Sequence, residues 1–188
     1  MNNQLIYNYK KTQRITQLLG KPKISDLEKY NQLIIVIPKK ESKSIWNLIP
    51  QGKKIKELIK NYSKGSSPAI TSRLKNTKQT SLHIGLLDSK LEAFDRLAFS
   101  RDMIKSVTQE KAGSLAIWVL GFETDFQKKF TEEILSAALV GQFILPSFKS
   151  KSPTQKITSI SLIGLDKKMI TKDIVAESDG NNLTRWLT

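Results

Sequence analysis

The 188-residue sequence contains no cysteine and a single histidine, His83. The lack of cysteine excludes disulfide bonds, cysteine-ligated zinc sites, iron–sulfur clusters and thiol catalysis. A single histidine excludes metal sites in which one helix supplies two histidine ligands. A Ser–His–Asp triad is also hard to build when no second base is present. Many common kinds of active site are therefore excluded.

Long apolar runs are also missing. The longest wholly apolar stretches, Leu33 to Pro38 and Leu115 to Leu120, are far shorter than the roughly 18 residues that a membrane-spanning helix needs. The N-terminus lacks the apolar centre of a signal peptide. We therefore expect a soluble, cytoplasmic chain with no membrane partner, and its length predicts one main domain.

Arginine is scarce although the chain is basic. Lysine and arginine total 31 against 17 acidic residues, a net charge of +14, and only five of these cations are arginine. Residues 1 to 80 hold 17 of the cations but four acidic residues. This excess predicts binding of nucleic acid or another polyanion through residues 1 to 80. A lysine-rich compositional bias with a solvated face explains the same numbers, because arginine supplies the bidentate contacts that read guanine.

Strand and helix patterns alternate from residue 32 onward. The β-branched run at Leu33 to Pro38 and the apolar run at 114–121 are typical of strands buried on both faces. The alternation predicts an α/β fold with three α/β/α layers and a mostly parallel or mixed sheet. Residues 2 to 31 are polar and basic and give no firm pattern. We expect further strands at 69–74, 81–87 and 156–164, and helices at 53–62, from Asp88 or Ser89 to about 110, from Thr124 to about Val140, and over Ile170 to Trp186.

Helix ends and faces give more detailed expectations. Thr124 and Gln127 have the spacing of a capping box at the start of a helix. In the helix before it, one apolar stripe is expected to pack on the sheet. Its members are Leu91, Phe94, Ala98, Ile104 and Val107.

The candidate catalytic side chains have simple structural interpretations. His83 alternates with Leu82 and Ile84, which puts it on the polar face of a strand as a satisfied histidine. Glu132 and Glu133 are neighbours that point about 100° apart on a helix, so they predict a solvated face and not a metal site. The same interpretation applies to four charged residues of the preceding helix, namely Asp95, Arg96, Arg101 and Asp102.

Gly52 and Lys53 begin a helix, and such a start can attract an anion. A phosphate-binding loop would need glycine at position 47 and serine or threonine at position 54, where this chain has Asn47 and Lys54. No dinucleotide fingerprint occurs either. We expect Trp46 and Trp118 to pack in the core or at its edge.

Two segments carry a resemblance to a known family. Asp173 to Thr188 resembles the helix that joins the two domains of leucine aminopeptidases, and Ala138 to Lys151 is similar to that family's small-residue helix end with its aromatic-rich turn. The positions that match the joining helix are Asn182, Leu183, Arg185 and Leu187, and those that match the turn are Phe143, Phe148, Lys149 and Ser150. Trp186 is expected to pack against a second domain.

The resemblance implies that the chain is the N-terminal, macro-domain-like domain of a metal-dependent leucyl aminopeptidase. Residues 1–31 would be a basic segment, residues 32–165 the α/β domain, and residues 166–188 the start of the helix that leads to a missing catalytic domain. Such domains support the catalytic domain and a homo-oligomer, a hexamer in this family. Two divalent ions, zinc or manganese, would be bound by the catalytic domain.

No catalytic or metal-binding residue can be assigned to this chain, because the family signature Asn-Thr-Asp-Ala-Glu-Gly-Arg is absent. No cofactor is expected within these residues. Two alternatives stay open. One is a stand-alone basic module that binds nucleic acid or another polyanion. The other is a macro-type domain that binds a nucleotide derivative, which rests on analogy of fold alone.

Overall fold

The computed structural model describes residues 14–40, 43–62, 69–109, 113–142 and 157–187, with backbone only at 61, 62, 186 and 187. Six strands form one sheet in the order β1-β6-β5-β2-β4-β3. The strands are β1 Arg14–Leu19, β2 Gln32–Pro38, β3 Ala69–Arg73, β4 Ser81–Leu87, β5 Ser114–Val119 and β6 Ser159–Leu165. The helices are α1 Ile24–Leu27, the 3-10 helix η1 Ile45–Asn47, α2 Gly52–Tyr62, α3 Ala93–Thr108, α4 Thr124–Gly141 and α5 Lys172–Leu187.

The sheet is parallel except at one edge, where β3 pairs with β4 in the antiparallel direction. The central strands β2 and β5 are buried on both faces, because alternate residues enter two separate cores. Ile34 and Val36 face one core, whereas Leu33 and Ile35 face the other. This arrangement confirms the mixed, mostly parallel sheet and the fully buried central strands that the apolar runs predict.

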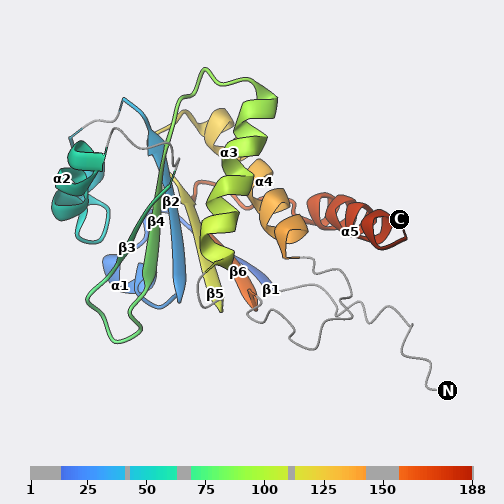
Figure 1. The fold of residues 1–188 in the computed structure, drawn as a ribbon, viewed down its shortest axis with the longest axis horizontal. Coiled ribbons are helices and arrows are strands. Elements are labelled where there is room, and N and C mark those ends of the chain that lie inside the picture. Colours follow the sequence, from blue (N-terminus) through green and yellow to red (C-terminus); the bar gives the residue numbers. More distant parts are fainter. Residues whose placement is uncertain (1–13, 41–42, 63–68, 110–112, 143–156, 188) are drawn as a thin grey trace.

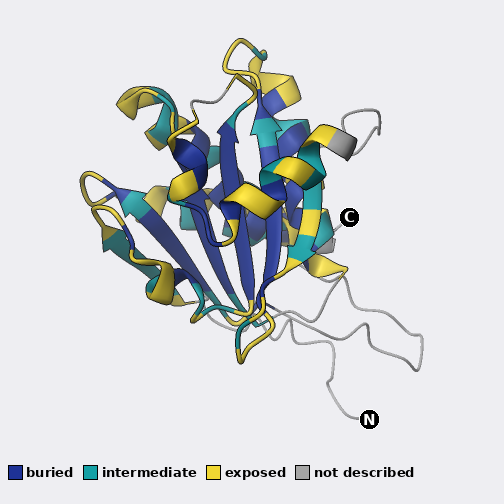
Figure 2. Ribbon diagram, turned by 90° about the vertical axis from the view of Figure 1, so that its left-hand side faces the viewer, coloured by how far each residue is buried: buried dark blue, intermediate teal, exposed yellow. Residues whose placement is uncertain are grey.

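Helices cover both faces of the sheet, which confirms the three-layer α/β/α architecture (Figure 1). Helices α3 and α4 pack together over one core, and α5 lies against α4 on the outer side. The other core lies beneath α1, η1 and α2. Figure 2 shows the buried strands between these two layers, with exposed residues on the outward faces of the helices.

The edge strand β1 was not predicted, and it lies within residues 1–31, which the sequence analysis set apart as a basic segment. It pairs with β6 in parallel from Arg14 to Leu19. The Gln17 side chain completes this edge, because its Nε2 donates to the Met169 carbonyl at 2.9 Å and its Oε1 accepts from the Met169 N–H at 2.8 Å. The sheet therefore begins before residue 32.

Replacing Gln17 with alanine should lower the free energy of unfolding by about 1 to 2 kcal/mol, because two hydrogen bonds to one backbone unit are lost. Urea unfolding of the 188-residue protein measures this loss. Gln109→Ala is the control, since Gln109 lies exposed just after α3 and should leave stability unchanged. Equal losses in the two variants would contradict this role of Gln17.

Three details of the helices differ from the sequence prediction. Helix α3 begins at Ala93 after an N-cap at Glu92, because Asp88 instead closes a tight turn by accepting from the Lys90 N–H at 3.0 Å. Phe94 lies outside the expected apolar stripe and is 72% exposed.

The capping box at Thr124 is also wrong. Glu123 is the N-cap of α4, without a side-chain hydrogen bond, and Gln127 donates to the Gly164 carbonyl at 3.1 Å. Gln127 thus ties α4 to the end of β6 and does not cap its own helix. Among the described helices, none is long and apolar enough to span a membrane.

Candidate functional site

His83 is fully buried in β4, under helix α3. Its Nε2 lies 2.7 Å from Gln32 Oε1 on β2, and its Nδ1 lies 3.0 Å from Ser106 Oγ on α3 and 3.2 Å from Thr71 Oγ1 on β3. An amide oxygen can only accept, so Nε2 carries the proton and Nδ1 can accept one hydroxyl hydrogen. The Thr71 hydroxyl can supply it, because the Ser106 hydroxyl donates to the Met103 carbonyl. The prediction of a satisfied histidine is confirmed, but its face of the strand is covered and not solvated.

The Ser106–His83–Gln32 series has the order of a nucleophile, a base and an orienting group. Two observations exclude that chemistry. The imidazole has no exposed surface, so no substrate can reach it, and the Ser106 hydroxyl also lies 2.7 Å from the Met103 carbonyl of its own helix. The series is a structural bridge between β2, β3, β4 and α3.

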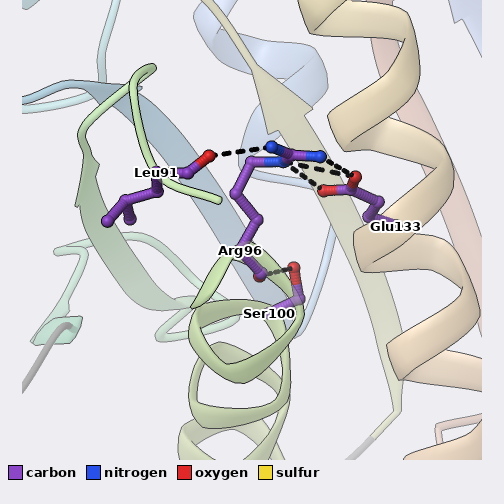
Figure 3. A network of polar contacts seen from close by, with 4 residues as sticks. All are labelled: Leu91, Arg96, Ser100 and Glu133. Atoms are coloured by element: carbon purple, nitrogen blue, oxygen red, sulfur yellow. Dashed lines mark hydrogen bonds and ion pairs between the residues drawn. The ribbon is translucent and has the colours of Figure 1, made fainter. Parts of the chain in front are cut away.

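A second buried polar group joins α3 to α4 (Figure 3). Arg96 Nη2 and Nε donate to the Glu133 carboxylate at 2.7 to 3.2 Å, and Arg96 Nη1 donates to the Leu91 carbonyl at 2.9 Å. The guanidinium also lies over the Phe126 ring, 5.9 Å from its centroid. The hydrogen bonds that Arg96 donates to the Glu133 carboxylate raise the pKa of Arg96 above its ordinary value.

This pair corrects the prediction that Arg96 and Glu133 are surface charges. Arg96 is 8% exposed and belongs to the interior. Asp95, Arg101 and Asp102 are exposed, as predicted. The adjacent Glu132 does not form a metal site with Glu133. Within the described ranges, no group of three acidic, histidine or cysteine side chains lies close enough together to hold a metal ion. No step through a metal is derived for these residues.

The motif in α5 docks that helix onto the end of α4. Asn182 is buried, and its Nδ2 donates to the Leu139 carbonyl at 3.4 Å. Arg185 Nη1 donates to the Val140 carbonyl at 3.3 Å. Both acceptors belong to the last turn of α4, where carbonyls lack the usual partner four residues on; the Val140 carbonyl also accepts from the C-cap N–H of Gln142. The structure therefore brings Asn182 and Arg185 together as a cap for another helix.

The opposite side of the motif is less covered. Leu183 is 45% exposed, and the side chains of Trp186 and Leu187 lie outside the described residues, as do Phe143, Phe148, Lys149 and Ser150 of the family-like turn. On the docked face, Ser178 Oγ and Asn182 Oδ1 are buried without a hydrogen-bond partner in the described part of the chain. The α4–α5 contact is therefore polar and incompletely satisfied.

The carboxyl ends of β2 and β5 meet where the strand order reverses, which is where α/β sheets commonly bind ligands. At this point Gly121 follows β5, and a Cβ at this position would lie 2.5 Å from Ile45 Cδ1 and 3.1 Å from Pro38 Cδ. Ile45 is itself buried. The end of β5 is therefore packed closely against Ile45 and Pro38.

Trp46 and Trp118 are both 3% exposed, which confirms their assignment to the core. The backbone of η1 also contacts the start of α2, because a Cβ at Gly52 would lie only 1.9 Å from the Trp46 carbonyl oxygen. Glycine is therefore required at position 52 for close packing, whereas its sequence context suggested an anion site. Beside this contact is a shallow, open depression of about 390 Å³, lined by Asn47, Gln51, Lys53 and Lys54 among others.

No protein-family profile matches the sequence, and a search of the curated proteins finds no relative. Solved structures do match the fold. A mutant of tomato leucine aminopeptidase is similar with a TM-score of 0.64 and 12% sequence identity, over 94% of this chain and 38% of that chain. At this identity the likeness shows a shared fold. The chain thus spans well under half the length of the enzyme that it is similar to.

Proposed function

We propose that this chain is the non-catalytic N-terminal domain of a metal-dependent leucyl aminopeptidase, which removes N-terminal amino acids from peptides. The observation that carries the proposal is the likeness to tomato leucine aminopeptidase, which covers 94% of this chain but 38% of the enzyme. A fold shared with one portion of an enzyme supports, by analogy of fold, a role as that portion, with the chemistry supplied elsewhere in the polypeptide.

The geometry of α5 supports the same role. Asn182 and Arg185 fix the helix to α4 through the Leu139 and Val140 carbonyls. Leu183, between them in sequence, remains 45% exposed. A helix that is anchored through its polar face and presents a leucine outward is suited to lead into a further domain and to pack against it.

The proposal extends to features outside the described residues. Two divalent ions, zinc or manganese, would lie in the catalytic domain, where such ions polarise a carbonyl and activate a water molecule. The enzyme would be a cytoplasmic homo-oligomer, a hexamer as the family resemblance implies. The domain described here would position the catalytic domain and contribute contacts between subunits.

The purified 188-residue protein should hydrolyse no leucyl p-nitroanilide when zinc or manganese is added, because its described residues hold no cluster of metal ligands and the histidine is inaccessible. A colorimetric assay with each ion measures this. The control is a complete leucine aminopeptidase under identical conditions. Reproducible metal-dependent turnover by the 188-residue protein would overturn its non-catalytic role.

The intact mass of the native gene product provides the complementary test. We expect a mass that exceeds this chain by at least one further domain, on the order of 100 to 200 residues or more, together with metal-dependent release of leucine by the native product. A native product with the mass of these 188 residues would contradict the assignment to an aminopeptidase.

A further inference from the structure

We propose that the lysines of α2 and of the segment between β2 and α2 form a docking surface for the phosphodiester backbone of nucleic acid. Residues 39 to 60 contain seven lysines and two glutamates, with no arginine. Six of these lysines are exposed, namely Lys39, Lys40, Lys43, Lys53, Lys54 and Lys60. The first five, which lie between the end of β2 and the first turn of α2, are called the basic corner. This surface is separate from the α4–α5 contact on which the proposed function rests.

Two close contacts hold these lysines at one end of the sheet. Ile45 and Pro38 both approach Gly121, so the chain is held near the end of β5 just before Lys39 and just after Lys43. Gly52 packs on the backbone of Trp46, which brings the start of α2, with Lys53 and Lys54, close to η1. Packing of the described residues therefore holds both parts of the basic corner.

The local chemistry suits a phosphate chain. The depression of about 390 Å³ beside η1 is lined by Lys53, Lys54 and the amide-bearing Asn47 and Gln51, together with the apolar Trp46 and Ile49. The first turn of a helix presents unpaired N–H groups and partial positive charge. Lys56 lies over the Trp46 ring, 5.7 Å from its centroid, so its charge stays on this side of the helix.

Some lysines among the first 80 residues make contacts within the protein and lie away from the basic corner. Lys29 Nζ lies 2.7 Å from Asp26 Oδ1, and Lys78 Nζ donates to the Lys29 carbonyl at 2.7 Å. These cations make intramolecular contacts near α1 and the β3–β4 turn. Lys21, Lys23 and Lys75 are exposed as well, so the basic corner is distinguished by its five exposed lysines within residues 39–54 and not by exposure alone.

Nucleic acid fits this surface better than an anionic membrane does. A helix that binds a membrane surface buries large apolar side chains in the lipid. In α2 the apolar side chain of Ile55 is buried and that of Ile59 packs toward the core beneath the sheet. The large apolar side chains that are exposed in the described structure lie on other elements. Lysines without arginine predict contacts with phosphate and little reading of base sequence.

The test is the salt dependence of binding to a fluorescein-labelled DNA duplex of about 20 base pairs, compared between two double variants. Lys53→Gln with Lys54→Gln removes two charges from the basic corner. Lys128→Gln with Lys129→Gln removes the same number of charges from adjacent exposed positions on α4, on the other side of the sheet. Both pairs of glutamines are compatible with a helix, and thermal unfolding verifies that both variants fold.

The unmodified protein should bind the duplex at about 50 mM salt, with an affinity that falls steeply as salt rises. The Lys53/Lys54 variant should bind roughly tenfold or more weakly and lose about 2 from the slope of log affinity against log salt, since each phosphate contact contributes about 0.9. The Lys128/Lys129 variant should retain at least half of the original affinity. A second duplex of unrelated sequence should give the same affinity.

Three results would overturn the proposal. The first is an absence of binding by the unmodified protein at low salt. The second is an equal loss of affinity in both double variants, which would show that net charge alone acts. The third is tighter binding to phosphatidylserine vesicles than to DNA through the same two lysines, which would assign the surface to membranes. None of these results bears on the aminopeptidase role of the domain.

Discussion

Replacing Arg96 with methionine should lower the free energy of unfolding by about 3 kcal/mol or more, because it leaves the Glu133 carboxylate, whose side chain is 14% exposed, without its ionic partner. Arg96 supplies three hydrogen bonds to that carboxylate and a fourth to the Leu91 carbonyl. Methionine retains most of the aliphatic volume, so little of the loss comes from packing. For a domain of this size the melting temperature should fall on the order of 10 °C, as calorimetry would measure.

A double-mutant cycle separates the charge from the packing. Glu133→Gln keeps the shape of the side chain but should also destabilise, since Arg96 then remains charged at 8% exposure. Arg96→Met combined with Glu133→Leu should lose much less than the two single changes together, because no buried charge remains. Arg101→Met, at an exposed position of the same helix, is the matched control. Additive losses in the cycle would contradict a direct coupling of Arg96 and Glu133.

The sequence predicted the elements that are defined by local patterns. β2 and β5 are continuous apolar runs, and the apolar residues of α2 recur at helical spacing, so hydrophobic periodicity alone locates them. The succession of strands and helices then restricts the fold to a layered α/β sheet. The burial of Trp118 follows from its place in β5, whereas Trp46 lies in η1, for which no local pattern predicts an element.

The features that the sequence missed depend on partners distant in the chain. β1 lacks an apolar run because it is an edge strand, and its residues are satisfied by groups more than 140 positions away. Thr16 Oγ1 lies 2.6 Å from Ser161 Oγ, and Gln17 pairs with Met169. Arg96 and Glu133 are 37 residues apart, and each on its own looks like an ordinary helix charge. No local signal distinguishes them from exposed neighbours.

The motif in α5 is a second case in which the sequence does not predict the contacts of a residue. Asn182 and Arg185 could be selected from the sequence by their resemblance, but their contacts could not. The carbonyls that they cap belong to Leu139 and Val140, more than 40 positions earlier. The carbonyls at the end of a helix need hydrogen-bond donors from outside the helix. That α5 supplies these donors to α4 becomes visible only when the two helices are seen side by side.

Replacing His83 with alanine should lower the free energy of unfolding by about 2 to 4 kcal/mol, the second largest effect that we expect. The change opens a cavity at a position with no exposed surface. It also removes the donor to Gln32 Oε1, the acceptor for the Thr71 hydroxyl and the contact of Nδ1 with Ser106 Oγ. Of these partners Gln32 is buried, and a buried polar group that loses its partner costs about 1 to 3 kcal/mol. Chemical unfolding measures the total.

The strands in which hydrogen exchange accelerates distinguish the loss of a structural bridge from a simple loss of packing. His83 joins β4 to β2, to the edge strand β3 and to α3, and β3 contacts β4 alone within the sheet. Hydrogen exchange in His83→Ala should therefore accelerate most in β3, and least in β5 and β6. Ser106→Ala is the milder companion, because the Thr71 hydroxyl remains within 3.2 Å of Nδ1. Uniform acceleration across the sheet would contradict the bridge, because a cavity alone destabilises the whole cooperative unit.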